Sequence, residues 1–258
     1  MVEEKVYFQD FFKIAGILSK PKTQADKIVV LVHGLGVDKE EGGFFTKLAG
    51  NLAEEGIASF RFDFRSRGES QGTWEDYTIT GMLADLTYAI KFLKTKGYKE
   101  IGVVAASLGG SIAVLYCAYI SVKFLCLLNP ILTYKDLLQP ETEWGGKWFR
   151  WSEMKRGYIE FEDTKLGMTF YKDLKEIDLL SNINKVKTPV LILHGDKDTY
   201  IPVSHSLKYY KLFGGKSDMV VIEGADHGFV GFENRVIPKI LSFVKKYFPV
   251  VKAGGKYE

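Results

Sequence analysis

One serine stands where an apolar strand passes directly into a helix. The run 101–106 is apolar, and Ser107 is followed by Leu108 and two glycines. A serine hydroxyl is a poor nucleophile at neutral pH, so it needs a base, a group that orients the base, and donors for the oxyanion. A sharp strand-to-helix turn with small neighbours holds such a serine in a strained conformation. The pattern indicates a nucleophile; the alternative is a serine that caps the helix.

Two carboxylates follow another apolar strand. The run 190–194 leads into a turn that contains Gly195, Asp196 and Asp198. A carboxylate there can accept the Nδ1 proton of a histidine, which fixes the tautomer of the ring and stabilises the imidazolium. Acids in a turn can instead bond to their own backbone. The residues alone leave open which acid has which role.

His227 is the best candidate for the base among the four histidines. It lies in a loop just after the last expected strand, where it could reach back over a sheet. His205 stands at the start of an expected surface helix. His33 and His194 end strands beside glycines, where we expect them to shape turns rather than to titrate in catalysis.

Strand-like apolar runs alternate with amphipathic stretches along most of the chain, which predicts an α/β fold with a mostly parallel sheet and helices on both faces. The expected strands are 27–32, 58–62, 101–105, 124–128, 189–193 and 219–222. The expected helices are 44–55, 79–96, 107–120, 204–213 and 238–248, the second capped by Thr78. The runs 5–8 and 12–18 suggest an antiparallel hairpin at the edge of the sheet.

The segment from about 133 to 180 departs from this alternation and is expected to be an insertion above the sheet. The runs 158–161 and 165–168 predict a small hairpin, followed by a helix over 170–180. Trp144, Trp148 and Trp151 have the spacing of one helix face. Such a stripe could face an apolar substrate, or it could form the small core of the insertion.

Composition indicates one globular domain over residues 1–258. The hydrophobic fraction of 46% and the charged fraction of 26% are ordinary for a soluble protein. A net charge of +3 without a dense basic run argues against nucleic-acid binding. No segment has the roughly 20 uninterrupted apolar residues of a membrane span, and residues 1–10 do not resemble a secretory signal.

Cys117 and Cys126 fall in apolar stretches, so we expect buried thiols in a reducing cytoplasm. Only four Gln and five Asn accompany many Lys and Glu, a balance that suggests a thermophilic source as a hypothesis. The sequence leaves a monomer and a homodimer open.

Taken together, these motifs resemble the α/β-hydrolase superfamily over nearly the whole chain. The residues that carry the resemblance are the serine turn, His33 to Gly36 after the first long strand, His194 to Asp198, and the chain order serine, acid, histidine. The chain is most similar to small cinnamoyl (feruloyl) esterases and monoacylglycerol lipases. The usual Gly-x-Ser-x-Gly pattern has Ala105 at its first position, and Ser66 replaces a glycine in the superfamily's Asp-x-Arg-Gly-x-Gly-x-Ser turn.

The resemblance implies an eight-stranded sheet with a lid inserted after strand 6, at about 133–180. It also implies a catalytic triad of Ser107, Asp198 and His227, because the second Asp of the turn is the acid in these relatives. The oxyanion hole would be the backbone N–H groups of Leu35 and Leu108. The first turn of a helix independently favours negative charge at Leu108. No cofactor and no metal are implied, and the arginines at 63–70 are expected to pin loops.

The expected function is hydrolysis of a small-molecule carboxylic ester through an acyl-enzyme, with an apolar acyl or aryl group of hydroxycinnamoyl type. An acylglycerol lipase, a thioesterase or a peptidase-like acyl hydrolase could use the same triad. A small-molecule binder without turnover is the alternative from a different class. Because the base must be neutral, kcat/KM should fall where an ordinary histidine gains its proton, at about pH 6.5.

Overall fold

An eight-stranded sheet forms the centre of the computed structural model, which describes residues 1–9, 11–22, 25–138, 141–144, 147–154, 156–161 and 163–249. In spatial order its strands are β1 (Val2–Gln9), β2 (Lys13–Lys20), β4 (Ala58–Phe62), β3 (Lys27–Val32), β5 (Glu100–Ala106), β6 (Leu125–Leu128), β11 (Val190–Gly195) and β12 (Ser217–Ile222). β1 pairs antiparallel with β2, and β2 pairs antiparallel with β4. All other neighbours in this sheet are parallel. The α/β-hydrolase fold and the N-terminal hairpin are confirmed.

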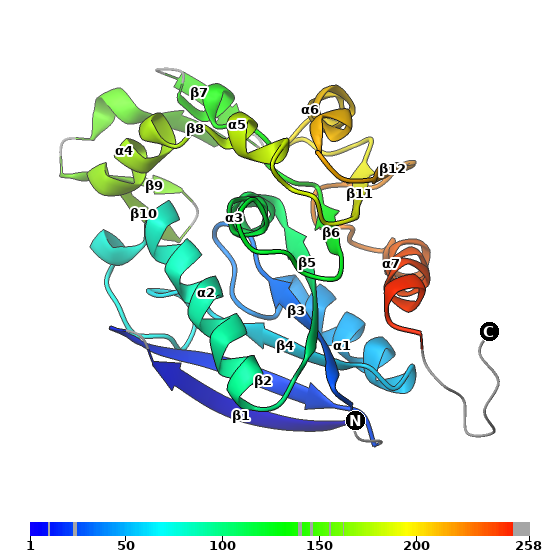
Figure 1. Ribbon diagram of the computed structural model, residues 1–258. Helices are drawn as coiled ribbons and strands as arrows, with labels where there is room; N and C mark the ends of the chain where they lie inside the picture. Colours follow the sequence, from blue (N-terminus) through cyan, green and yellow to red (C-terminus); the bar gives the residue numbers. More distant parts are fainter. Residues whose placement is uncertain are drawn as a thin grey trace.

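Helices cover both faces of the sheet (Figure 1). They are α1 (Phe44–Glu54), α2 (Ile79–Thr95), α3 (Ser107–Cys117), α6 (Val203–Tyr209) and α7 (Glu233–Tyr247). Successive residues of β3 belong to different apolar clusters: Val30 packs with α2 and α3, whereas Val29 packs with α1 and α7. A strand buried on both faces needs a continuous apolar sequence, which explains the β-branched run of β3.

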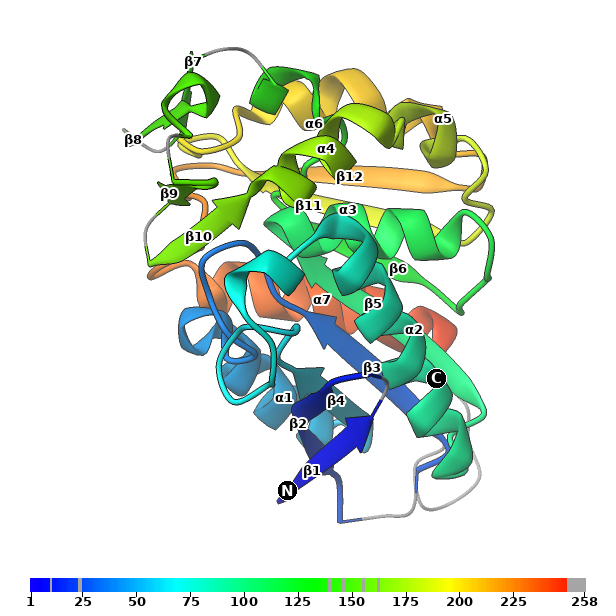
Figure 2. The same ribbon diagram turned by 90° about the vertical axis from the view of Figure 1, so that its left-hand side faces the viewer.

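The connection between β6 and β11 carries a separate group of elements. They are η3 (Lys135–Leu138), β7 (Glu141–Trp144), β8 (Lys147–Arg150), η4 (Trp151–Glu153), β9 (Tyr158–Phe161), β10 (Thr164–Gly167), α4 (Met168–Glu176) and α5 (Leu179–Ile183). Both views place them together along the upper side of the molecule (Figures 1 and 2). The expected hairpin at β9 and β10 is present, with Thr164 paired to Phe161.

Three details of the sequence analysis are wrong. Trp144 and Trp148 lie on the antiparallel pair β7 and β8, not on a helix, since the intervening glycines favour a turn. The helix expected over 170–180 is two helices separated at Ile177, which has an extended backbone. α7 begins at Glu233, five residues before Pro238, and continues through this proline, although a proline inside a helix removes one hydrogen bond and usually ends or bends it.

Several other expectations are confirmed. Thr78 caps α2 by accepting a hydrogen bond from Gly81 N at 2.9 Å. Cys117 and Cys126 are buried free thiols. Across the described residues, every helix falls short of the length or the apolar character that a membrane crossing needs.

The carboxyl ends of the parallel strands meet at one edge of the sheet. β3 leads to Leu35, β5 to Ser107, β6 to Asn129, and β11 and β12 to the turns that hold Asp198 and His227. The strand order reverses around β3, whose neighbours are β4 and β5. In open α/β sheets, ligands bind outside the carboxyl ends at such a switch point, so this edge is the place to look for a site.

Candidate active site

Ser107 occupies the turn from β5 into α3 with a positive φ of 50°. A non-glycine residue adopts this left-handed conformation only where the surroundings enforce it. The close approach of the preceding loop does so here: a Cβ at Gly109 would lie 2.3 Å from His33 O, and one at Gly34 would lie 3.0 Å from Ser107 Cβ. Ser107 is 7% exposed, so it is mostly buried but still accessible to solvent. The geometry fits a nucleophile turn better than a capping serine.

We predict that Gly109→Ala lowers the free energy of unfolding by about 1–3 kcal/mol, because the new methyl group meets backbone atoms that cannot rotate away. Gly50→Ala is the matched control. Gly50 lies inside α1 with nothing within 4 Å of an added Cβ, so the same change should raise stability by about 0.5–1 kcal/mol. Urea unfolding measures both. A neutral result at Gly109 contradicts the tight approach of the two loops.

Asp198 and His227 are in direct contact. His227 Nδ1 donates to Asp198 Oδ2 at 2.7 Å. The other carboxylate oxygen, Oδ1, accepts the backbone N–H groups of Tyr200 and Ile201, both at 2.8 Å. Tyr200 also packs against the imidazole, with ring centroids 5.0 Å apart. The acid therefore holds the ring in one tautomer, with Nε2 left to act as a base.

A second histidine, His194, also contacts the carboxylate of Asp198. The ring is buried, and its Nε2 lies 3.4 Å from Asp198 Oδ2 and also contacts Ile201 O. The other ring nitrogen, Nδ1, contacts Ser206 Oγ at 2.8 Å. Burial alone would raise the pKa of Asp198, but the hydrogen bonds from His194 and His227 outweigh it and lower that pKa to about 2. Asp198 is thus ionised throughout the neutral range. Its neighbour Asp196 instead accepts Gly224 N at 2.6 Å, so it bonds to the backbone of the loop after β12 and not to that of its own turn.

Asn129, which the sequence analysis missed, ties the loops together. It follows β6 with a positive φ of 45°. Its Nδ2 donates to His227 O at 2.6 Å and its Oδ1 accepts Gly195 N at 2.9 Å. The Asn-Pro pair at 129–130 signals a turn in the sequence, but the contact with His227 crosses almost a hundred residues and no local pattern reports it.

Ser107 is linked to this network through the backbone: Ile131 N, two residues after Asn129, donates to Ser107 O at 3.2 Å. Within the described residues, no hydrogen bond joins Ser107 Oγ to the His227 ring. The structure therefore brings the acid and the histidine into contact and places the serine at the same edge of the sheet.

The two backbone groups expected to form an oxyanion hole flank Ser107. Neither Leu35 N nor Leu108 N donates a hydrogen bond to any acceptor among the described residues. Leu108 lies in the first turn of α3, where free N–H groups attract negative charge. His33 contacts Gly34 O through Nδ1 at 2.9 Å and accepts Phe64 N at Nε2. Burial lowers the pKa of His33 to about 4, so the ring is neutral and shapes the turn.

Residues 29–236 match the model of the alpha/beta hydrolase family. The chain belongs to this family. Among solved structures, Est1E from Butyrivibrio proteoclasticus with bound ferulic acid has a TM-score of 0.85 and 23% identity, covering 94% of this chain and 99% of that chain.

Two curated relatives match over a smaller share of the chain. An acyl transferase of Vibrio campbellii is 26% identical over 194 residues, which are 68% of this chain and 63% of that protein. This chain therefore spans less than two thirds of the relative's length. The human serine hydrolase BPHL is 24% identical over 215 residues, which are 78% of this chain and 73% of that protein.

The turn after β4 keeps the family pattern despite its substitution. Ser66 takes a φ of 66°, a conformation that glycine adopts freely, which explains why a glycine is usual there. Arg65 forms a buried ion pair with Asp85 at 2.7 Å. Arg67 donates to Val37 O and to Thr164 Oγ1. The arginines thus pin loops, as the sequence analysis expected, and Arg67 joins β10 to the loop after β3.

Trp151 belongs to the packing of the β6–β11 connection. Its ring is buried against Tyr171, with centroids 4.7 Å apart, and its Nε1 donates to Leu137 O at 2.7 Å. The side chains of Trp144 and Trp148 lie outside the described part of the structure. Trp151 therefore fits the second interpretation of the tryptophan stripe, in which it forms part of the small core of the insertion.

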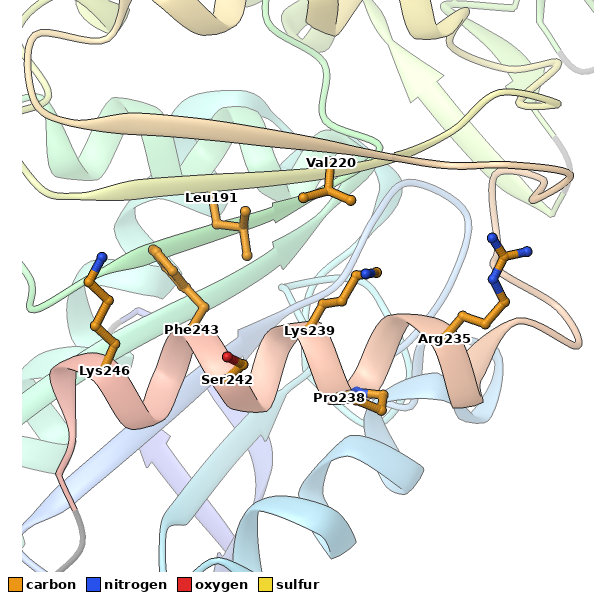
Figure 3. A pocket seen from close by; sticks show the side chains of 8 residues that line it. All are labelled: Leu191, Val220, Arg235, Pro238, Lys239, Ser242, Phe243 and Lys246. Carbon is orange, nitrogen blue, oxygen red and sulfur yellow. The ribbon is translucent and has the colours of Figure 1, made fainter. Parts of the chain in front are cut away.

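A groove of about 410 Å³ lies between α7 and the strands β11 and β12 (Figure 3). Apolar Leu191, Val220 and Phe243 line it together with basic side chains of α7. None of the candidate catalytic residues lines this groove. The described residues also contain no cluster of three or more His, Cys, Asp or Glu side chains placed to hold a metal ion.

Proposed function

We propose that this α/β hydrolase is a serine carboxylesterase in which Ser107 is the nucleophile, His227 the base and Asp198 the acid that orients it. The observation that carries the proposal is the 2.7 Å contact of His227 Nδ1 with an Asp198 carboxylate whose oxygens are all engaged. The positive φ of Ser107 supports the same assignment, because it presents the hydroxyl at the edge where these groups gather.

The proposed reaction has two steps. Ser107 Oγ attacks the ester carbonyl while His227 Nε2 takes its proton, and the same proton then goes to the leaving alcohol. Water hydrolyses the acyl-enzyme by the reverse sequence of proton transfers. Leu35 N–H and Leu108 N–H stabilise the oxyanion in both steps. The hydroxyl and the imidazole come within hydrogen-bond distance when substrate binds, as catalytic contacts often tighten in the complex.

The connection between β6 and β11 is proposed to be the lid of a single α/β-hydrolase domain. Arg67 joins β10 to the loop after β3, and Phe170 of α4 stacks on Tyr77 with parallel rings. These contacts hold the connection close to the serine edge of the sheet. The many aromatic residues of this segment favour an apolar acyl or aryl group over a sugar or a phosphate.

A substrate panel tests the function. We expect p-nitrophenyl and hydroxycinnamate esters to be hydrolysed with higher kcat/KM than acyl thioesters, monoacylglycerols or peptides. A preference for thioesters or monoacylglycerols would replace the esterase assignment by one that uses the same triad. A thermal melt of the same protein tests the thermophily hypothesis, since a melting midpoint in the ordinary mesophile range removes it.

The pH profile tests the base. Asp198 stays ionised down to about pH 2, so its protonation cannot contribute to a loss of activity between pH 8 and pH 5. We expect kcat/KM to fall as the pH drops from 8 to 5, because a protonated imidazole cannot take the proton of the serine. A flat profile from pH 5 to 8 contradicts a histidine base.

A further inference from the structure

A second carboxyl group lies beside the serine turn, and the proposed mechanism does not use it. Glu41 follows the loop after β3 and has a positive φ of 48°. Its Oε2 accepts a hydrogen bond from Gly34 N at 2.7 Å. A Cβ built on Gly34 would lie 3.0 Å from Ser107 Cβ and 3.6 Å from Glu41 Oε1. Gly34 is therefore flanked by the serine and by this carboxyl group.

The contact determines the orientation of one peptide plane in the turn. Gly34 N belongs to the peptide between His33 and Gly34, which Glu41 holds. His33 holds the next peptide, between Gly34 and Leu35: its Nδ1 contacts the carbonyl oxygen of Gly34 at 2.9 Å. The N–H of this second peptide is that of Leu35. Two side chains thus hold the two consecutive peptides that lead to the first oxyanion donor.

We propose that Glu41 is a positioning residue that holds the turn at Gly34 and so directs Leu35 N–H toward the oxyanion. The inference rests on the proposed esterase function and adds a residue to it. Misplacing a catalytic donor by about 1 Å can cost on the order of a hundredfold in rate. A carboxyl group that only filled space would have no such effect on turnover.

The protonation state of Glu41 does not alter this role. Burial raises its pKa to about 7, against the opposing effects of Gly34 N–H and the His227 charge, and the nearby Asp38 raises it further. Both the acid and the carboxylate can accept the Gly34 N–H through an oxygen. A glutamine keeps that acceptor and the length of the side chain, and it removes the charge.

The test compares three substitutions with one control. Glu41→Ala and Glu41→Met remove the acceptor, and methionine preserves the length if alanine does not fold. We expect each to lower kcat on a p-nitrophenyl ester by 10- to 100-fold with KM changed little, because the donor acts mainly in the transition state. Glu41→Gln should stay within about threefold of the wild type.

Glu40→Ala is the matched control. The side chain of the neighbouring Glu40 accepts Arg61 Nε at 2.9 Å and also Thr46 Oγ1, and among the described residues it has no hydrogen bond to the Gly34 turn. Its loss should lower the melting temperature and leave kcat within about twofold, because an ion pair remote from the reacting atoms acts on stability.

The rate of fluorophosphonate labelling separates this inference from the proposed function. The phosphoryl oxygen of the reagent occupies the same oxyanion hole, so Glu41→Ala should also be labelled 10- to 100-fold more slowly. If folded Glu41→Ala and Glu41→Met are labelled and turn over normally, the inference about Glu41 is wrong and the proposed function is unaffected. The inference is also wrong if Glu41→Gln loses as much activity as these two variants. A wild type that is never labelled contradicts the proposed serine mechanism itself.

Discussion

Replacing Ser107 by alanine is expected to lower kcat on a p-nitrophenyl ester by about 10⁴- to 10⁶-fold, because the acyl-enzyme can no longer form. The residual rate comes from the oxyanion donors and from substrate binding, which the substitution leaves in place. Alanine tolerates the turn as well as serine does, so the fold and KM should change little. Steady-state kinetics with a circular dichroism melt measure both quantities.

Ser111→Ala is the matched control for this substitution. Ser111 lies one turn further along α3, fully buried, and its Oγ donates to Ile131 O at 2.8 Å. Its loss should cost about 1 kcal/mol of stability and leave kcat within a few fold. If Ser107→Ala retains more than a tenth of the activity, the nucleophile has been assigned to the wrong residue.

Asp198→Asn should lower kcat by about 10⁴-fold while the overall geometry is preserved. The carboxylate now accepts Tyr200 N and Ile201 N through one oxygen and His227 Nδ1 through the other. An asparagine that keeps the two backbone donors turns its NH₂ group toward the ring. The imidazole must then present Nδ1 as an acceptor, so Nε2 carries the proton and cannot serve as the base.

Asp196 provides the control within the same turn. It accepts Gly224 N at 2.6 Å through Oδ1, and within the described part of the chain no hydrogen bond joins it to the imidazole of His227. Asp196→Asn keeps an oxygen acceptor, so kcat should remain within about threefold of the wild type. Equal losses in the two variants would mean that the turn as a whole, and not the Asp198 carboxylate, determines the activity.

The central sheet could be predicted because its strands carry strong local signals. The run 28–32 is apolar throughout, as expected of a strand that is buried on both faces, and the expected bounds of β3 and β4 coincide with those in the structure. The residues of the candidate site could be proposed because each comes within a few residues of the end of a recognisable strand. Their relative distances depend on the strand order, which no local pattern contains.

What could not be predicted depends on contacts between distant parts of the chain. Asn129 and Glu41 look like ordinary turn residues until their partners, His227 and Gly34, are placed beside them. The spacing of the tryptophans is compatible with a helix, but residues 141–144 and 147–150 form two short antiparallel strands instead. Helix ends also differ from the expectation, since the helix predicted over 238–248 already begins at Glu233.

The most direct test is peptide mapping of the fluorophosphonate adduct by mass spectrometry on the wild-type protein and on Ser107→Ala. The proposed mechanism predicts one adduct, located on Ser107, that disappears in Ser107→Ala and forms far more slowly in Asp198→Asn. An adduct on another residue, or an unmodified wild type that still hydrolyses esters, would contradict the assignment of Ser107 as the nucleophile.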